Sequence, residues 1–141
     1  MGISVSSSGS PSRFHLTGED IINECKSSVN FNEKSVLVTG GTNGIGLETC
    51  RVLACAGANV YALGRDQSKL ENVVKTIQNE LKEKTSSGSI QGYICDLNSF
   101  QSIKEFADKF EQDHCQVNIL ILNAGITNFN YVKTIDELYW C

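Results

Sequence analysis

Apolar and polar residues along the chain form two kinds of block that follow one another in regular alternation. Short apolar runs, typical of strands buried on both faces of a parallel sheet, lie at 35–39, 59–63, 90–95 and 117–122. Between them, apolar residues recur with the spacing of amphipathic helices. Strand–helix alternation with short connections favours parallel pairing and right-handed crossovers. We therefore expect a doubly wound α/β sheet of about four strands in the order 3-2-1-4, with three complete helices.

Each of the three predicted helices carries one apolar side. The first spans about 44–56 and meets Gly57, a residue type favoured just after a helix C-terminus. Its apolar side comprises Ile45, Thr49, Val52, Leu53 and Ala56. Asp66 can cap the second helix, and the apolar side there comprises Leu70, Val73, Val74, Ile77 and Leu81. The third is marked by Phe100, Ile103, Phe106, Ala107 and Phe110, and a capping box at Thr134-Ile-Asp-Glu137 predicts the start of a further helix.

The residues before the first strand differ from the rest in composition. Residues 1–13 contain six serines and almost nothing to bury, which predicts a disordered tail. Residues 14–33 form a helical lead-in to the predicted domain at 34–141. The start lacks the charged and apolar regions of a secretory signal, which favours a cytoplasmic protein. Gly2-x-x-x-Ser6 matches an acylation pattern, so peripheral membrane attachment through Gly2 is the alternative.

Charge and cysteine content exclude several classes of function. The net charge of −4 argues against a nucleic-acid binder, whose surface would carry a basic face. The six cysteines include no C-x-x-C pair, so we expect no zinc site and reduced thiols. No stretch approaches the ~20 consecutive apolar residues that span a bilayer.

A glycine-rich segment, Thr39-Gly-Gly-Thr-Asn-Gly-Ile-Gly46, joins the first predicted strand to the first helix. Glycines at this junction allow a sharp turn, a close approach of the backbone to a diphosphate, and tight packing of helix on sheet. The free N–H groups of the helix start then face the anion. The alternative is a tight structural turn. The residues expected to bind a dinucleotide here are Gly40, Thr42, Asn43, Gly44, Ile45 and Gly46.

Three further motifs stand at the ends of the other predicted strands: Gly64-Arg-Asp66, Asp96-Leu97 and Asn123-Ala124-Gly125. Together with the TGGTNGIG segment they resemble the short-chain dehydrogenase/reductase family, over about 34–140. The run from Asp96 to Phe106 is similar to its retinol-dehydrogenase-like and WW-domain-oxidoreductase-like branch. The resemblance implies a Rossmann-type fold that binds NAD(P), with Asp96 and Leu97 at the adenine and Asn123, Ala124 and Gly125 beside the nicotinamide ribose. Alternatively, Asp96 caps the third helix, and Asn123 holds the loop after the fourth strand.

The end of the second strand favours NADP over NAD. An acidic residue there would accept hydrogen bonds from the ribose 2′-OH of NAD, but Gly64 occupies the position and Arg65 follows it. A guanidinium offers a planar fork to the 2′-phosphate of NADP. The alternative is that Arg65 is a solvated charge paired with Asp66.

The residues that carry out hydride-transfer chemistry in the family are absent from this sequence. The resemblance implies a Ser and a Tyr-x-x-x-Lys pair that act on an alcohol or carbonyl, yet none of Tyr61, Tyr93, Tyr131 and Tyr139 has a lysine four residues later. We therefore expect no catalytic residue in the chain as given. It is either a shortened form of an NAD(P)-dependent oxidoreductase whose complete form takes a small hydrophobic substrate, or a non-catalytic dinucleotide-binding or interaction module.

The fourth predicted strand would form an exposed edge of the sheet. Its sequence, Val117-Asn-Ile-Leu-Ile-Leu122, is apolar and contains no Pro or Lys to discourage pairing. We therefore expect self-association through this edge, or poor solubility.

Overall fold

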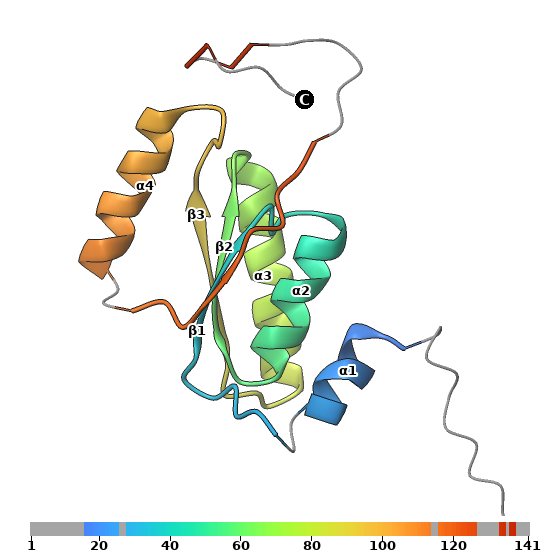
Figure 1. Ribbon diagram of the computed structural model, residues 1–141. Helices are drawn as coiled ribbons and strands as arrows, with labels where there is room; N and C mark the ends of the chain where they lie inside the picture. The colour runs from blue at the N-terminus through green and yellow to red at the C-terminus, as the bar shows by residue number, and fades with distance from the viewer. Residues whose placement is uncertain (1–15, 26–27, 114–115, 127–132, 135, 138–141) are drawn as a thin grey trace, which may run out of the picture.

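The computed structural model describes residues 16–25, 28–113, 116–126, 133–134 and 136–137. Four parallel strands form one sheet in the order β3-β2-β1-β4, which confirms the predicted topology (Figure 1). The strands are β1 (Ser35–Thr39), β2 (Asn59–Gly64), β3 (Ser89–Ile94) and β4 (Ile119–Ile121). The central pairing joins Val36 to Val60 and Val38 to Ala62, so equivalent positions of adjacent strands face the same side.

The fourth strand is shorter than the predicted run of 117–122. Only Ile119–Ile121 pairs with β1. At its start, the side-chain Oδ1 of Asn118 accepts the Ser35 N–H at 2.8 Å, where a strand would offer a backbone carbonyl. Beyond its end, the chain turns toward the end of β1 through Asn123 and Ala124. The Asn118 N–H still donates to the Ser35 carbonyl at 2.9 Å, so at the start of β4 a side chain replaces only one partner of the ladder.

Helices cover both faces of the sheet, as a doubly wound fold requires (Figure 1). On one face, α2 (Gly44–Cys55) and α3 (Gln67–Glu83) pack on the inward side chains Val36, Val38, Val60, Ala62 and Ile90. On the other face, α4 (Phe100–Asp113) packs with Phe110 on Leu37, Tyr61, Leu63 and Tyr93. The Tyr61 and Phe110 rings meet edge to face with centroids 5.0 Å apart. None of the described helices has the length and apolar character needed to cross a membrane.

The buried side of α2 differs from the prediction. Ile45, expected on that side, is 81% exposed, and the buried residues are Gly46, Cys50, Val52, Leu53 and Ala54. Gly46 lies close to the Gly40 carbonyl just after β1, so this side of α2 faces the sheet. The side chain of Ile45, one residue earlier, then points about 100° away from it. At the other end, Gly57 adopts φ +104 and its N–H donates to the Ala54 carbonyl, which confirms it as the residue after the helix C-cap.

The second and third helices follow the predicted boundaries, with unequal burial. In α3 the predicted apolar side is confirmed, and Asp66 caps the helix by accepting the Lys69 N–H at 3.0 Å. In α4 the packing is made mainly by the second half: Phe110 is buried, whereas Phe100 is 60% exposed and Ala107 is exposed. Most of the expected apolar side of α4 is therefore only partly covered among the described residues.

The predicted helix start at Thr134 is wrong for the residues that the structure describes there. The Glu137 N–H donates to the Thr134 carbonyl in a turn, and Glu137 has φ +59, which is incompatible with a right-handed helix. The Asp136 carboxylate instead accepts the Phe100 N–H at 2.5 Å, at the N-terminus of α4. A carboxylate is favourable at that end of a helix. Residues 138–141 lie outside the described part of the chain.

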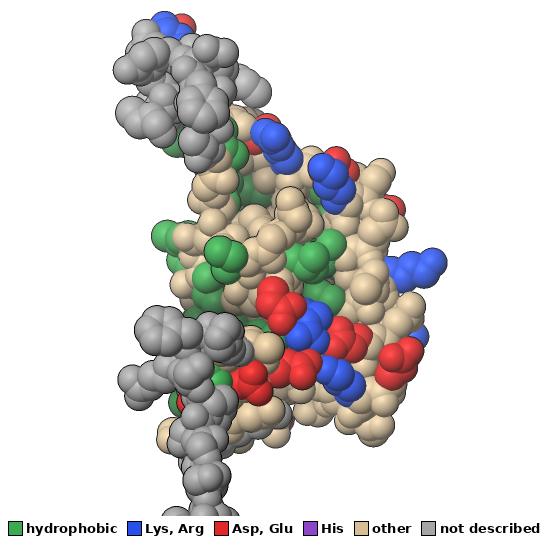
Figure 2. Space-filling view, turned by 90° about the vertical axis from the view of Figure 1, so that its right-hand side faces the viewer, with side chains coloured by type: hydrophobic (Ala, Val, Ile, Leu, Met, Phe, Trp, Pro, Cys, Tyr) green, Lys and Arg blue, Asp and Glu red, His purple; other side chains and the backbone are tan. Residues whose placement is uncertain are grey.

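An additional helix, α1 (Gly18–Cys25), lies within the predicted lead-in, whereas the predicted tail at 1–13 lies outside the described residues. A network of charged side chains joins α1 to α2 and α3. The Arg51 guanidinium contacts Glu19 at 2.9 Å, Glu48 at 2.7 Å and Glu80 at 2.5 Å, and Lys84 contacts Glu19 at 2.6 Å. Figure 2 shows acidic and basic side chains interleaved on this face. Ion pairs, together with the packing of Ile22 on the core, thus hold the lead-in helix against the domain.

Candidate functional site

A cavity of about 600 Å³ lies where the carboxyl ends of the strands meet. In doubly wound folds this edge of the sheet is where ligands bind. The predicted site residues that line the cavity are Gly40, Thr42, Asn43, Gly44, Arg65, Asp96, Leu97, Asn123, Ala124 and Gly125. Ile45 and Gly46 are not among its lining residues. The folded chain therefore brings together motifs that stand up to 85 residues apart, such as Thr39 and Ala124.

The glycine-rich segment forms one wall of the cavity, and its glycines have different roles. Gly44 has φ +53, and a Cβ built there would meet no atom within 4 Å, so a side chain at this position would project into open space. Gly46 is packed tightly, because a Cβ there would lie 2.3 Å from the Gly40 carbonyl oxygen. The absence of a side chain at Gly44 thus leaves the backbone accessible from the cavity. The absence of one at Gly46 lets α2 pack close to the end of β1.

The start of α2 presents backbone donors beside this wall. The Leu47 N–H is bonded to the Asn43 carbonyl, and helix geometry leaves the amides before it without an intrahelical acceptor. The Gly44 N–H is used by the Asn43 side chain at 2.8 Å. The N–H groups of Ile45 and Gly46 remain in the first turn, where the helix dipole favours an anion. The Ile45 side chain is exposed, and the expected contact of Ile45 with a ligand stays a prediction about its backbone N–H.

The Asn123-Ala124-Gly125 segment ties the end of β4 to the end of β1. The Asn123 Nδ2 donates to the carbonyl of Thr39 at 3.1 Å, and the Ala124 N–H donates to the Thr39 hydroxyl at 3.0 Å. Thr39 is 6% exposed. These bonds support the alternative in which Asn123 holds the loop after β4, and they also place Ala124 and Gly125 at the cavity.

Asp96 lies at the opposite end of the cavity, in a turn of its own. Its Oδ1 accepts the Asn98 N–H at 3.0 Å and the Asn98 Nδ2 at 2.8 Å. The capping of α4 is done by Ser99, whose hydroxyl accepts the Ser102 N–H at 3.2 Å. Asp96 is therefore not needed as the helix cap. Among the residues that the structure describes, the neighbouring Asn98 Oδ1 is buried without a hydrogen-bond partner.

The residues at the end of β2 form the third side of the cavity. Arg65 and Asp66 lie there as predicted, and Lys69, from the first turn of α3, joins them. Sequence reasoning missed Lys69 and Asn98. The sequence could have predicted that Lys69 lies at the cavity. It stands three positions after the Asp66 cap and therefore on the first turn of the helix, next to the strand end.

Cys95, which lines the cavity, and Cys50, which lies in the core, are unreactive thiols. Cys95 lines the cavity and is 4% exposed, and burial, with the charge of Asp96, raises the pKa of its thiol. Burial likewise raises the pKa of Cys50 to about 12. A thiol that stays protonated at neutral pH is a poor nucleophile, so neither side chain suggests covalent chemistry. The described residues contain no group of three or more His, Cys, Asp or Glu side chains that could hold a metal ion.

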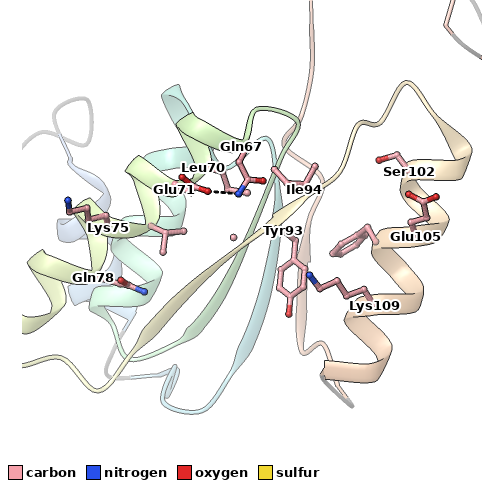
Figure 3. A pocket seen from close by; sticks show the side chains of 13 residues that line it. Gln67, Leu70, Glu71, Lys75, Gln78, Tyr93, Ile94, Ser102, Glu105 and Lys109 are labelled. Carbon is pink, nitrogen blue, oxygen red and sulfur yellow. Dashed lines mark hydrogen bonds between the residues drawn. The ribbon is translucent and has the colours of Figure 1, made fainter.

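A second groove, of about 560 Å³, runs along the outer edge of β3 between α3 and α4 (Figure 3). Its charged lining consists of Glu71, Lys75, Glu105 and Lys109, which come from the two helices. It contains none of the predicted site residues, and it lacks the glycine-rich segment whose backbone a diphosphate could approach. The cavity at the glycine-rich segment is therefore the better site for an anionic ligand.

The residues present fit a dinucleotide. The glycine wall gives the backbone access that a diphosphate needs, and the first turn of α2 supplies N–H donors. The unpaired Asn98 Oδ1 beside Asp96 is an acceptor near the region where adenine is expected. The cavity also reaches from Arg65 and Lys69 to Gly125 and Ile126, so its lining spans the ends of the sheet. The fold and the site together define a nucleotide-binding Rossmann protein.

Comparison with known families agrees with this description. A family model described as short chain dehydrogenase matches residues 34–140. The chain belongs to the short-chain dehydrogenase family. It is 38% identical to human retinol dehydrogenase 12 over 112 residues, covering 79% of this chain and 34% of that protein. It is 38% identical to human polyprenol dehydrogenase over 104 residues, covering 74% of this chain and 30% of that protein. The chain thus spans about a third of the length of these relatives, and the likeness to the retinol-dehydrogenase-like branch is confirmed.

Solved structures give the same assignment. A metagenomic short-chain oxidoreductase in complex with NADP superimposes with a TM-score of 0.61 at 30% identity, over 70% of this chain and 42% of that one. The RhlG/NADP active-site complex of Pseudomonas aeruginosa gives 0.60 at 27% identity, over 69% of this chain and 36% of that one. The fold is therefore that of oxidoreductases that bind a nicotinamide dinucleotide.

Proposed function

We propose that this chain is the NADP-binding part of an oxidoreductase that transfers hydride between the nicotinamide and a hydrophobic alcohol or carbonyl. The observation that carries the proposal is the cavity at the strand ends, with its open glycine wall at Gly44 and a cation at Arg65. Arg65 forms no ion pair among the described residues, so its guanidinium is available to a ligand. The alternative, in which Arg65 pairs with Asp66, is not among the described ion pairs, and Asp66 pairs with Lys69 instead.

Each part of the cavity would hold a different part of the cofactor. The amides of Ile45 and Gly46 would bind the diphosphate, and Asp96 with Leu97 would lie at the adenine. Ala124 and Gly125 would lie beside the nicotinamide ribose, positioned by the bonds that Asn123 and Ala124 make to β1. NADP supplies the hydride chemistry when bound, and these residues orient it.

The substrate class rests on relatives. Retinol dehydrogenase 12 and polyprenol dehydrogenase are named for hydrophobic alcohols. We therefore propose a substrate of that kind for the whole protein. The sequence given contains no Tyr-x-x-x-Lys, so proton transfer to or from the substrate oxygen would require residues outside these 141.

Titration calorimetry of the 141-residue chain with NADP and NAD tests the cofactor assignment. We expect binding of both, with NADP tighter, because Arg65 can pair with the 2′-phosphate. The Arg65→Ala variant should lose most of the preference while keeping its affinity for NAD. Equal affinities for the two cofactors in the unaltered chain would contradict the NADP assignment, as would an Arg65→Ala variant that leaves both affinities unchanged.

A second candidate function is a non-catalytic module that binds a dinucleotide or a protein partner. The exposed apolar edge of β4, where Leu120 is 56% exposed, favours it as a surface for a partner. The reading frame beyond Cys141 separates the two functions. An in-frame Ser followed by Tyr-x-x-x-Lys, and turnover of a hydrophobic alcohol by the extended protein, would support the enzyme. A stop codon there, with NADP binding and no turnover, would support the module.

A further inference from the structure

The rim of the cavity at the end of β2 carries two cations. Arg65 follows the strand, and Lys69 lies one turn into α3. The Asp66 carboxylate between them is occupied by the Lys69 backbone, whose N–H donates to Oδ1 at 3.0 Å. The Lys69 ammonium is 3.9 Å from the other carboxylate oxygen, at the limit of an ion pair, and its side chain is 70% exposed. The Asp66 carboxylate thus orients the helix while leaving both cations accessible.

The Thr42 side chain fills the space above Gly64. A Cβ built on Gly64 would lie 2.5 Å from Thr42 Cγ2, which no ordinary contact permits. Position 64 is where an acidic residue would accept hydrogen bonds from the ribose 2′-OH of NAD. Any side chain at this position would therefore have to displace Thr42. With Thr42 in this place, position 64 has no room for a carboxylate, and the charged groups of the rim are Arg65, Asp66 and Lys69.

We propose that Lys69 is a second specificity residue, which binds the 2′-phosphate of NADP together with Arg65, and that the Thr42–Gly64 contact excludes the acid that would favour NAD. This inference rests on the proposed function. A phosphate monoester carries about −1.5 to −2 charges at neutral pH, so two cations match it better than one. The guanidinium provides directed donors, and the ammonium provides a compact charge on a long stem.

Titration of the 141-residue chain with NADP and NAD tests the role of Lys69. The Lys69→Met variant keeps most of the side-chain stem and removes the charge, so we expect NADP to bind about tenfold more weakly and NAD to bind as before. The matched control is Lys75→Met, on the same helix but in the groove at β3, which should change neither affinity. Two shorter probes should repeat this result in Lys69→Met: adenosine 2′,5′-bisphosphate should bind more weakly, and 5′-AMP should bind as before.

The steric part is tested by an acid at position 64. Gly64→Asp alone should lower the thermal unfolding temperature and weaken both cofactors, because the new side chain collides with Thr42. In the Thr42→Gly, Gly64→Asp double variant, stability should recover and the affinity ratio should shift toward NAD. A Gly64→Asp variant with unchanged stability would overturn the steric exclusion.

The outcomes separate the two proposals. If the unaltered chain binds neither cofactor, the proposed function and this inference both fail. In another outcome, the unaltered chain prefers NADP while the Lys69→Met variant keeps that preference in full, or loses affinity for NAD as much as for NADP. Either result overturns only the role of Lys69.

Discussion

Gly44 and Gly46 stand two residues apart in the glycine-rich segment, yet the structure predicts opposite effects of adding a side chain at the two positions. A side chain at Gly44 would enter open space, whereas one at Gly46 would collide with the Gly40 carbonyl. Substitution at Gly46 therefore tests folding, and substitution at Gly44 tests binding. A sequence motif alone gives the two positions the same weight.

We predict that Gly44→Asn keeps the fold and weakens binding of NADP. Asn tolerates a positive φ better than most residues, so the free energy of unfolding should fall by about 1 kcal/mol or less. Its side chain would obstruct the diphosphate, and the affinity for NADP should fall at least about tenfold. Calorimetric titration and urea unfolding measure the two effects.

Gly46→Ala provides the contrast. It should reduce the free energy of unfolding by about 1–3 kcal/mol, because the added methyl is overpacked against β1. If Gly44→Asn binds NADP as the unaltered chain does, the glycine wall is not a diphosphate site.

At the scale of elements, α1 is attached by ion pairs and by the packing of Ile22 on the core. Thr17 and Asp20 close a reciprocal cap at its start: the Asp20 carboxylate accepts the Thr17 N–H at 2.8 Å, and the Thr17 hydroxyl accepts the Asp20 N–H at 3.2 Å. A helix of eight residues is marginal by itself in water. The contacts from Glu19 to Arg51 and Lys84 therefore contribute to its position on the domain.

We predict that this attachment weakens in acid. Hydrogen bonds from Lys84 and Arg51 lower the pKa of Glu19 to about 2 in the folded chain. A lowered pKa means that the contribution to stability is complete above the ordinary value of 4.5 and is lost as the pH falls toward about 2. The stability difference between the unaltered chain and Glu19→Gln should therefore be present at pH 7 and shrink progressively below pH 4.5.

Urea unfolding at several pH values, followed by circular dichroism, measures this difference. Glu83→Gln is the control, because Glu83 is exposed near the end of α3 and forms no ion pair in the described part of the chain. A Glu19→Gln effect that stays constant from pH 7 to pH 2 would argue against an ionic attachment.

The elements that the sequence predicted well are those whose signals are local. Apolar runs located all four strands, and the Asp66 cap and Gly57 located two helix ends. The rotation of α2 was missed because hydrophobic spacing does not register the close approach of Gly46 to a carbonyl on another element. The helix start predicted at Thr134 was wrong for a similar reason, since the Asp136 carboxylate binds the N-terminus of a helix distant in sequence. For the site, strand-end motifs identified most lining residues, whereas Lys69 and Asn98 required the fold.

At the scale of the whole molecule, the chain exposes apolar surface along β4. Leu120 pairs with Leu37 on the side of the sheet that carries α4, yet it is 56% exposed, and Leu122 is 77% exposed. The outer edge of β4 has no partner strand within the described sheet. Such an edge promotes pairing with another chain.

We predict that the isolated 141-residue chain associates through this edge. Sedimentation velocity should show dimers or larger species whose share rises with concentration, and Leu120→Lys should shift them toward the monomer. Val29→Lys replaces another exposed apolar residue, 43% exposed and distant in sequence from β4, and should leave the association unchanged. A monomer at all concentrations would contradict self-association.

The bonds from Asn123 and Ala124 to Thr39 have a thermodynamic consequence for this edge. They make one segment both a wall of the cavity and the anchor that keeps the last strand aligned. A ligand that binds the folded chain and not the unfolded one also stabilises this alignment. Occupancy of the cavity would thereby also protect the sheet from aggregation, and the proposed cofactor would act as a stabiliser of the polypeptide that binds it.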